Sequence, residues 1–393
     1  GSEMCIRDSG KYAPGKLTVT ESNDEDGRIV REFRDMDGLV VMTAEGIDGN
    51  LLCTRRVYDS YGRLCAVLPP DIADGSYTFD DDVMQNSAYI YRYDEFGRCV
   101  SSKIPGCDAA LTRYSRGGRV IAEHTPGMAS NRWLMHFYDR CGREVLTSLA
   151  AATEQRLQSV ADSLPVAAYD ASASGSYSFT PPLPMDVGTP QKALYYDSYD
   201  FLGSVTDSLP AVTRSQRVIG LLTGERDYAA TTAKTLTTAY GYNAEGRVAE
   251  KSEQTLNGAV HTAYTYDRRG NVLTERSVHT PRGQAPIVRE VTTAYNAAGR
   301  VARRRVTENG SEAEMSFAYD DCGRLASERM SNGVTRRYTY NIHGWPELTE
   351  TVVPVELQAD KDSVVQILPP LSPSYYPVSY THLRAHETLR HLV

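Results

Sequence analysis

Polar and apolar residues alternate along much of the chain with a period of two. The stretches AYIYRYD (88–94), HTAYTYD (261–267) and RRYTYN (336–341) show this alternation, and RVAEKSE, NVLTERS and RLASERM repeat it directly after a glycine. A period of two is typical of β-strands, whose successive side chains point to opposite faces. The pattern therefore predicts an all-β protein built from tandem antiparallel β-hairpins.

A short frame separates these strands: Tyr, then Asp or Asn, two variable residues, Gly and often Arg. Of twelve glycines that fit the frame, ten have Tyr four residues earlier, eleven have Asp or Asn three residues earlier, and eight are followed by Arg. Spacings of 21, 24 and 29 residues dominate, whereas gaps of 43 and 61 residues indicate interrupted units. Such self-similarity is the signature of a repeat protein. The glycines are Gly27, Gly38, Gly62, Gly97, Gly118, Gly142, Gly203, Gly246, Gly270, Gly299, Gly323 and Gly344.

The frame has the chemistry of a tight hairpin turn. Asp or Asn at the first turn position bonds backbone groups two residues on, and Gly at the fourth takes the left-handed conformation, which gives a hairpin with a glycine bulge. We expect positive φ at the twelve glycines. We also expect Tyr and Arg of the same turn to meet across it, in a cation–π contact of about 0.5–1 kcal/mol. The predicted turn residues are Tyr58, Asp59, Gly62, Arg63, Tyr93, Asp94, Gly97, Arg98, Tyr138, Asp139, Gly142, Arg143, Tyr242, Asn243, Gly246, Arg247, Tyr266, Asp267, Gly270, Tyr295, Asn296, Gly299, Arg300, Tyr319, Asp320, Gly323 and Arg324.

The chain divides into two repeat blocks and several segments outside the repeat. Residues 10–150 and 191–350 are the predicted blocks. The insert at 151–190 contains a short predicted helix (151–165) and a loop rich in Pro, Ser and Gly, and 351–377 is a proline-rich segment. Residues 1–9 and 378–393 resemble translated sequencing-adapter artefacts and are expected to be disordered. We therefore expect the chain to be a fragment, and we expect deletion of both ends to leave its melting temperature unchanged.

Composition narrows the choice of partners. A net charge of -8 disfavours nucleic acid or an anionic membrane surface. No apolar run approaches the roughly 20 residues of a membrane-spanning helix. The 7 cysteines are scattered without C-x-x-C spacing, which predicts neither a zinc site nor a disulfide framework, and Cys141 and Cys322 occupy variable turn positions where exposed thiols are expected.

Candidates for chemistry are few. The acidic stretch NDEDGRIVRE (23–32) lacks the acids that an EF-hand would need at Ser22 and Phe33, which favours a solvated turn over a calcium site. The basic run at 303–305 alternates between two strand faces and is followed by glutamates, which indicates a solvated surface. No phosphate-binding loop, dinucleotide fingerprint or nucleophile motif is present in the sequence. We therefore expect no enzymatic activity, and no catalytic, cofactor-binding or metal-binding residue.

The turn sequences resemble those of one family. YDSYGR, YRYDEFGR, FYDRCGR, YGYNAEGR, YTYDRRGN, AYNAAGR and AYDDCGR resemble the YD repeats of rearrangement-hotspot (RHS) proteins, and the chain is similar to the long RHS-repeat proteins of Bacteroides-like bacteria. The resemblance covers most of residues 20–350. It implies a long curved antiparallel sheet, part of a hollow shell that encloses a toxic C-terminal domain in a secreted or cell-surface polymorphic toxin. The family's self-cleaving core has no matching stretch here, so the resemblance assigns no catalytic residue.

Two hypotheses about function follow. In the first, the chain is a structural wall segment whose partners are the core region and the C-terminal toxin cargo of the same polypeptide. In the second, it is a carbohydrate or cell-surface binding module, whose repeated tyrosines stack on target-cell glycans, with Tyr264 and Tyr338 as test positions. The sequence favours the first hypothesis, because the repeated tyrosines occupy a fixed strand-end position where hairpin packing already accounts for them.

Overall fold

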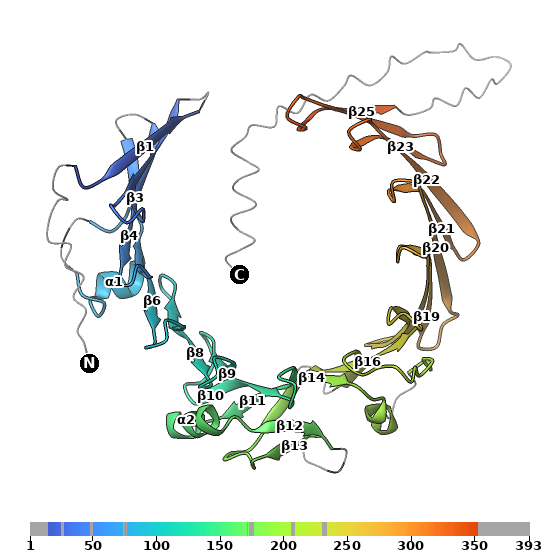
Figure 1. Cartoon of the computed structure of the whole chain (residues 1–393), viewed down its shortest axis with the longest axis horizontal. Coiled ribbons are helices and arrows are strands. Elements are labelled where there is room, and N and C mark those ends of the chain that lie inside the picture. The colour runs from blue at the N-terminus through green and yellow to red at the C-terminus, as the bar shows by residue number, and fades with distance from the viewer. Residues whose placement is uncertain are drawn as a thin grey trace. The chain divides into compact units, whose positions relative to one another are not determined.

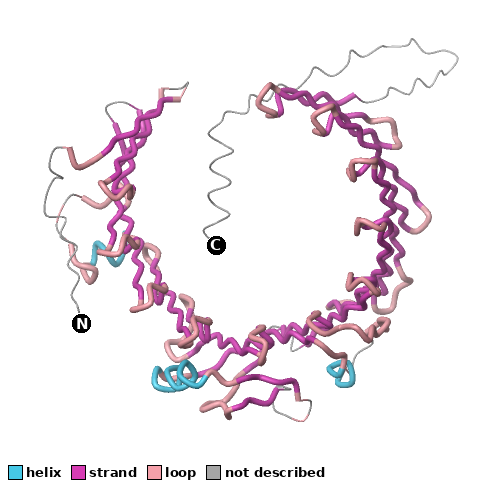
Figure 2. Tube along the Cα trace, viewed as in Figure 1, coloured by secondary structure: helices cyan, strands magenta, loops and turns pink. Residues whose placement is uncertain are grey.

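The computed structural model describes residues 15–352 except 25–26, 48–49, 74, 76, 171, 173–176, 206–208 and 230–233. Both ends expected to be artefacts, residues 10–14 of the first block and residues 353–377 lie outside the described residues. The described part of the chain contains 25 strands, two α-helices and one 3-10 helix. The predicted all-β class with tandem antiparallel hairpins is confirmed (Figures 1 and 2). None of the described helices has the length and apolar character that a membrane span requires.

The chain forms two compact units. The first comprises the described residues of Gly1–Leu194 and Asp227–Ala233, and the second comprises those of Tyr195–Arg226 and Lys234–Val393. The strands of the first unit are β1 (Thr18–Asn23), β2 (Arg28–Arg34), β3 (Val40–Ile47), β4 (Asn50–Tyr58), β5 (Leu64–Leu68), β6 (Tyr89–Tyr93), β7 (Cys99–Lys103), β8 (Ala110–Tyr114), β9 (Val120–His124), β10 (Arg132–Tyr138), β11 (Glu144–Ala151), β12 (Val166–Tyr169) and β13 (Tyr177–Thr180). The boundaries between the units fall within β14 (Thr189–Tyr196) and β15 (Leu222–Ala229). The strands of the second unit are β16 (Lys234–Tyr242), β17 (Val248–Thr255), β18 (Gly258–Tyr266), β19 (Val272–Pro281), β20 (Ile287–Tyr295), β21 (Val301–Glu308), β22 (Ser311–Tyr319), β23 (Leu325–Met330), β24 (Thr335–Tyr340) and β25 (Pro346–Val352).

Strands β1 to β11 of the first unit pair consecutively as an antiparallel meander. β11 then pairs with β14, and the β12–β13 hairpin meets β10 through a parallel bridge between Tyr138 and Val166. The helix α1 (Asp82–Ser87) precedes β6, and α2 (Glu154–Ser163) forms within the stretch where a helix was predicted.

The buried core of the first unit lies where these helices cover the strands. Met84 of α1 packs with Leu68 and Ile90 of β5 and β6. Leu157 and Val160 of α2 are buried, and α2 contacts β8 and β9. Burial of such side chains stabilises folding by roughly 1.5–3 kcal/mol each, so the helices give this unit a local second layer.

Strands β16 to β25 of the second unit also pair consecutively. Successive connections of an antiparallel meander lie at alternate ends of its strands. The five frame turns of this unit are every second connection, so they all lie at the same ends of the strands, along one side of the sheet (Figure 2). The segment between β14 and β15 packs on the first strands of the unit, where the Thr213 amide and hydroxyl both donate to the Glu250 carboxylate. From β18 onward most strand residues are only half-buried or exposed.

Candidate functional site: the ladder of turns

Eleven frame turns share one backbone geometry. In the turn that joins β4 to β5, the Asp59 amide donates to the Arg63 carbonyl at 2.9 Å, and the Gly62 amide donates to the Asp59 carbonyl at 3.0 Å. Gly62 has a φ of 76°, and the strand register shifts between Val57 and Tyr58, which is the expected glycine bulge. The same pair of backbone bonds forms at the turns of Gly27, Gly38, Gly97, Gly118, Gly142, Gly246, Gly270, Gly299, Gly323 and Gly344.

The twelfth register was predicted wrongly. Gly203 lies in a 3-10 helix, η2 (Asp200–Ser204), and is absent from the described glycines with positive φ. The turn that precedes β15 instead uses Asp197 and Gly220. The Asp197 amide donates to the Leu221 carbonyl at 3.2 Å, the Gly220 amide donates to Asp197 Oδ1 at 2.6 Å, and Gly220 has a φ of 86°.

The physical reason for this error is an insertion inside the turn. Residues 198–219 separate Asp197 from Gly220 in the sequence, so no fixed local spacing links these two turn positions. Phe201 of η2 is buried and stacks on Tyr195 with ring centroids 4.3 Å apart, and the Arg226 guanidinium donates to the Phe201 carbonyl at 2.8 Å. Packing of the inserted segment therefore replaces the chain continuity of an ordinary turn.

Four turns carry an ion pair between Asp and Arg. The Nε–H of Arg63 donates to Asp59 Oδ2 at 2.6 Å, and Arg98 does the same to Asp94 at 2.6 Å. Asp139 with Arg143 and Asp320 with Arg324 form equivalent pairs. Burial works to raise the pKa of the Asp59 carboxyl, but hydrogen bonds from the Arg63 amide and guanidinium outweigh it and hold the pKa below its usual value.

Nine of the ten frame tyrosines bond to the preceding hairpin on the same side of the sheet, whereas Tyr199, of the wrongly predicted register, donates to the Tyr240 carbonyl. The Tyr93 hydroxyl donates to the Leu64 carbonyl at 2.9 Å, directly after the arginine of the previous turn. Burial raises the pKa of the Tyr93 phenol, so the phenol keeps the proton that it donates. The full set of these bonds is Tyr58 to Val40, Tyr93 to Leu64, Tyr114 to Cys99, Tyr138 to Val120, Tyr242 to Leu222, Tyr266 to Val248, Tyr295 to Val272, Tyr319 to Val301 and Tyr340 to Leu325.

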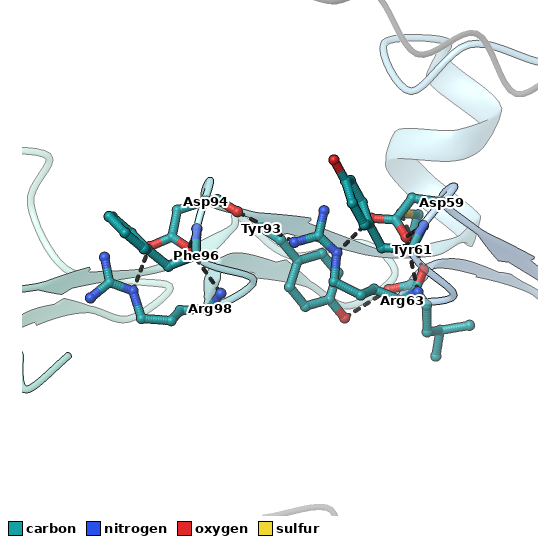
Figure 3. Close-up of polar contacts among 9 residues, drawn as sticks. Asp59, Tyr61, Arg63, Tyr93, Asp94, Phe96 and Arg98 are labelled. Atoms are coloured by element: carbon teal, nitrogen blue, oxygen red, sulfur yellow. Dashed lines mark hydrogen bonds and ion pairs between the residues drawn. The ribbon is translucent and has the colours of Figure 1, made fainter.

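The arginines reach in the opposite direction, toward the next hairpin. The expected contact with the frame tyrosine of the same turn was wrong. The Arg63 guanidinium lies 4.9 Å from the Tyr93 ring centroid of the next hairpin and donates to the Asp94 carbonyl at 3.3 Å (Figure 3). Such an interaction between neighbours depends on the distance between successive turns, which strand pairing sets. The other pairs are Arg98 with Tyr114, Arg119 with Tyr138, Arg247 with Tyr266, Arg300 with Tyr319 and Arg324 with Tyr340.

Tyrosine, turn backbone and arginine thus form a continuous set of cross-links along one side of the sheet in each unit, at the strand ends that carry the frame turns. We call this set of cross-links the ladder. Every rung joins two consecutive hairpins and uses the residues that recur in the sequence frame. Of the eleven frame turns, only the turn of Gly27 lies at the opposite strand ends, because it connects β1 to β2 while the turn of Gly38 connects β2 to β3. The arrangement holds consecutive hairpins together.

The sequence also drew attention to possible metal ligands, two turn cysteines and the basic run at 303–305. No group of three or more His, Cys, Asp or Glu suited to a metal ion occurs among the described residues. Cys141 and Cys322 are exposed free thiols, as expected from their turn positions. Arg303 and Arg305 are exposed, and both pair with Glu314 on the neighbouring strand, as a solvated surface would.

His136 was not singled out from the sequence. It lies on β10 between two carboxylates, with Nδ1 3.0 Å from Glu144 on β11 and Nε2 3.6 Å from Glu123 on β9. Burial lowers the pKa of this imidazole, but the two glutamates outweigh burial and raise the pKa above its ordinary value. Only strand pairing brings the three residues together, so no sequence spacing signals the cluster.

Comparison with known proteins supports the fold. The chain is similar to the crystal structure of TcdB2-TccC3, with a TM-score of 0.55, and to that of TcdB2-TccC3 without its hypervariable C-terminal region, with a TM-score of 0.56. The sequence identity is 15% in both cases, and each match covers 83% of this chain. The chain spans only 14% of the length of either solved chain. No family model and no curated protein matches the chain.

Proposed function

We propose that this chain is a wall segment of a bacterial RHS/YD-repeat protein, which encloses or displays a C-terminal toxin domain of the same polypeptide. The ladder is the observation that carries the proposal. The residues that recur with the frame form contacts that join neighbouring hairpins, and a wall of repeated hairpins requires such contacts. The likeness in fold to TcdB2-TccC3 over 83% of the chain supports this reading.

The two faces of β20 to β23 differ in their share of apolar side chains. Alternate residues of a strand share a face. One face carries Val306, Met315 and Phe317 together with Arg304 and Glu328, since Met315 lies opposite Arg304 and Met330, and Phe317 lies opposite Glu328. The other face carries cross-strand ion pairs, including Arg305 with Glu314 at 3.1 Å. We assign the face of the cross-strand ion pairs to solvent and the face with the larger share of apolar side chains to the enclosed polypeptide.

The proposal includes no enzymatic activity for this chain. Its partners are the remainder of its own polypeptide, namely a core region and a toxin cargo, and neither nucleic acid nor glycan is needed. A protein of this kind acts outside the cell that makes it, so we place it in the secreted or cell-surface class. The negative net charge of -8 agrees with a wall that does not bind nucleic acid.

Self-association of the isolated chain tests the proposal. Within the described residues β1 pairs with β2 and β25 with β24, which leaves an outer edge on each. Unpaired strand edges promote association. We expect the chain alone to form concentration-dependent oligomers in size-exclusion chromatography, and the longer gene product to be a compact, monodisperse particle in negative-stain images.

Charged edge residues provide the matched variants. Thr20→Lys on β1 and Thr351→Lys on β25 should reduce association, because lysine at an edge opposes strand addition. Thr292→Lys, at an exposed position of the internal strand β20, should leave association unchanged. An isolated chain that stays monomeric at all concentrations, together with a longer product that is open and extended, would show the proposal to be wrong.

A further inference from the structure

A hollow lies between two consecutive turns of the ladder in the second unit. It has a volume of about 390 Å³ and lies between the turns of Gly246 and Gly270, a size typical of small-molecule sites. Its lining includes the half-buried ring of Tyr264, the small side chain of Ala249 and the guanidinium of Arg247. An aromatic ring beside a cation is a suitable surface for a ring-shaped anionic ligand.

Arg247 differs from the arginines of the Asp turns in its hydrogen bonds. In those turns the Asp carboxylate accepts the arginine Nε–H, as Arg63 and Arg98 show (Figure 3). Asn243 takes the Asp position before Arg247, and no ion pair of Arg247 occurs among the described residues. Its guanidinium lies 5.7 Å from the Tyr266 ring centroid and donates through Nη1 to the Asp267 carbonyl at 3.3 Å. Nε–H therefore remains for another acceptor.

The carboxylates beside the hollow do not take the place of that acceptor. Asp267 accepts hydrogen bonds from the Arg269 amide, the Asn271 amide and the Asn271 side chain, at 2.8 to 2.9 Å. Glu245 lies at the exposed tip of its turn. Glu245, Asp267 and Arg268 also line the hollow, but among the described residues neither carboxylate forms an ion pair with Arg247.

We infer that this hollow binds a carboxylate carried on a sugar ring, of which a uronate is the representative, with the carboxylate on Arg247 and the ring against Tyr264. Arginine suits this ligand because its planar N–H donors match the two oxygens of a carboxylate. The site is additional to the ladder and does not depend on the proposed wall function.

Two equivalent Asn→Asp substitutions test the site. Asn243→Asp gives Arg247 the carboxylate partner that the other turns have, so the turn should be at least as stable while the affinity for glucuronate falls about tenfold or more. Asn296→Asp makes the same change at Arg300, which stacks on Tyr319 at 5.5 Å but does not line the hollow, and should leave the affinity unchanged. Binding is measured on the full chain by calorimetry and saturation-transfer NMR.

Three further measurements test which groups of the ligand and of the hollow contribute to binding. Glucose, which lacks the carboxylate, should bind at least tenfold more weakly than glucuronate, by the loss of a charged hydrogen-bond pair. Glu245→Gln should strengthen glucuronate binding, because it removes a negative charge from the rim. Tyr264→Ala should weaken binding, whereas Tyr338→Ala, at the equivalent position two residues before Tyr340, should not. Equal binding of glucose and glucuronate, equal effects of the two Asn→Asp variants, or no binding by the unmodified chain would each overturn the assignment.

Discussion

The ladder makes a quantitative prediction at two glycines with the same backbone. Gly299 and Gly323 have φ values of 79° and 82°, so alanine costs roughly 1–2 kcal/mol of backbone strain at either. A Cβ on Gly299 would lie 3.8 Å from its nearest neighbour, Arg269 Nη1, whereas a Cβ on Gly323 would overlap the Arg300 guanidinium. Displacing that guanidinium from Tyr319 adds the loss of a cation–π contact, about 0.5–1 kcal/mol at a solvent-accessible site.

We therefore expect Gly323→Ala to destabilise β20 to β23 by about 1.5–3 kcal/mol and Gly299→Ala by about 1–2 kcal/mol. Native-state hydrogen exchange, read by mass spectrometry on peptides from these strands, measures both local opening free energies. In an Arg300→Ala background the two glycine variants should cost the same. Equal costs in the unmodified chain, or a difference that persists without Arg300, would refute the account of the ladder.

Three other predictions follow from acid–base groups and turn geometry. The lowered pKa of Asp59 means that its turn is stabilised above the ordinary Asp pKa of about 3.9 and loses this contribution as the pH falls through the folded value; acid melting curves of Asp59→Asn should lack that loss. The raised pKa of His136 gives the opposite pH dependence. Its contribution to stability is complete below about pH 6.5 and disappears as the pH rises through the folded value, so His136→Gln should flatten the pH dependence of the unfolding free energy in urea between pH 6 and 9. Gly270→Val should lower the melting temperature more than Arg269→Ala, because Gly270 has a φ of 96° while Arg269 is an exposed turn residue; an equal effect would contradict the turn assignment.

The turns could be predicted from sequence because each depends on four consecutive residues. Asp, Asn or Ser at the first position and Gly at the fourth recur in all eleven turns, because these residues favour the turn and its bulge. Asp200 and Gly203 show that the pair alone does not suffice. The ladder contacts could not be predicted in the same way. Whether Arg63 meets Tyr58 or Tyr93 depends on which strands pair, and the chosen partner lies 30 residues away (63 to 93) across a helix-containing connection.

The misplaced register shows where local turn chemistry becomes ambiguous. The sequence YYDSYDFLG contains two Tyr-Asp pairs, and only Tyr199-Asp200 has a glycine at the frame spacing. The chain uses Asp197 with Gly220 instead, because the inserted segment buries Phe201. A signal was present in the spacing: Gly220 precedes Gly246 by 26 residues, close to the dominant 24, whereas Gly203 precedes it by 43.

The ladder also explains how a sheet with two open faces holds its hairpins together. Strands β20 to β23 have no large buried core in the described residues, so cross-strand pairs and the edge contacts must supply much of their stability. One rung combines a tyrosine hydrogen bond, worth about 0.5–1.5 kcal/mol, with a cation–π contact of about 0.5–1 kcal/mol. Together these approach the strain that a misplaced Cβ introduces at one turn. Because each rung joins only neighbouring hairpins, its loss should loosen those two hairpins and leave distant ones intact.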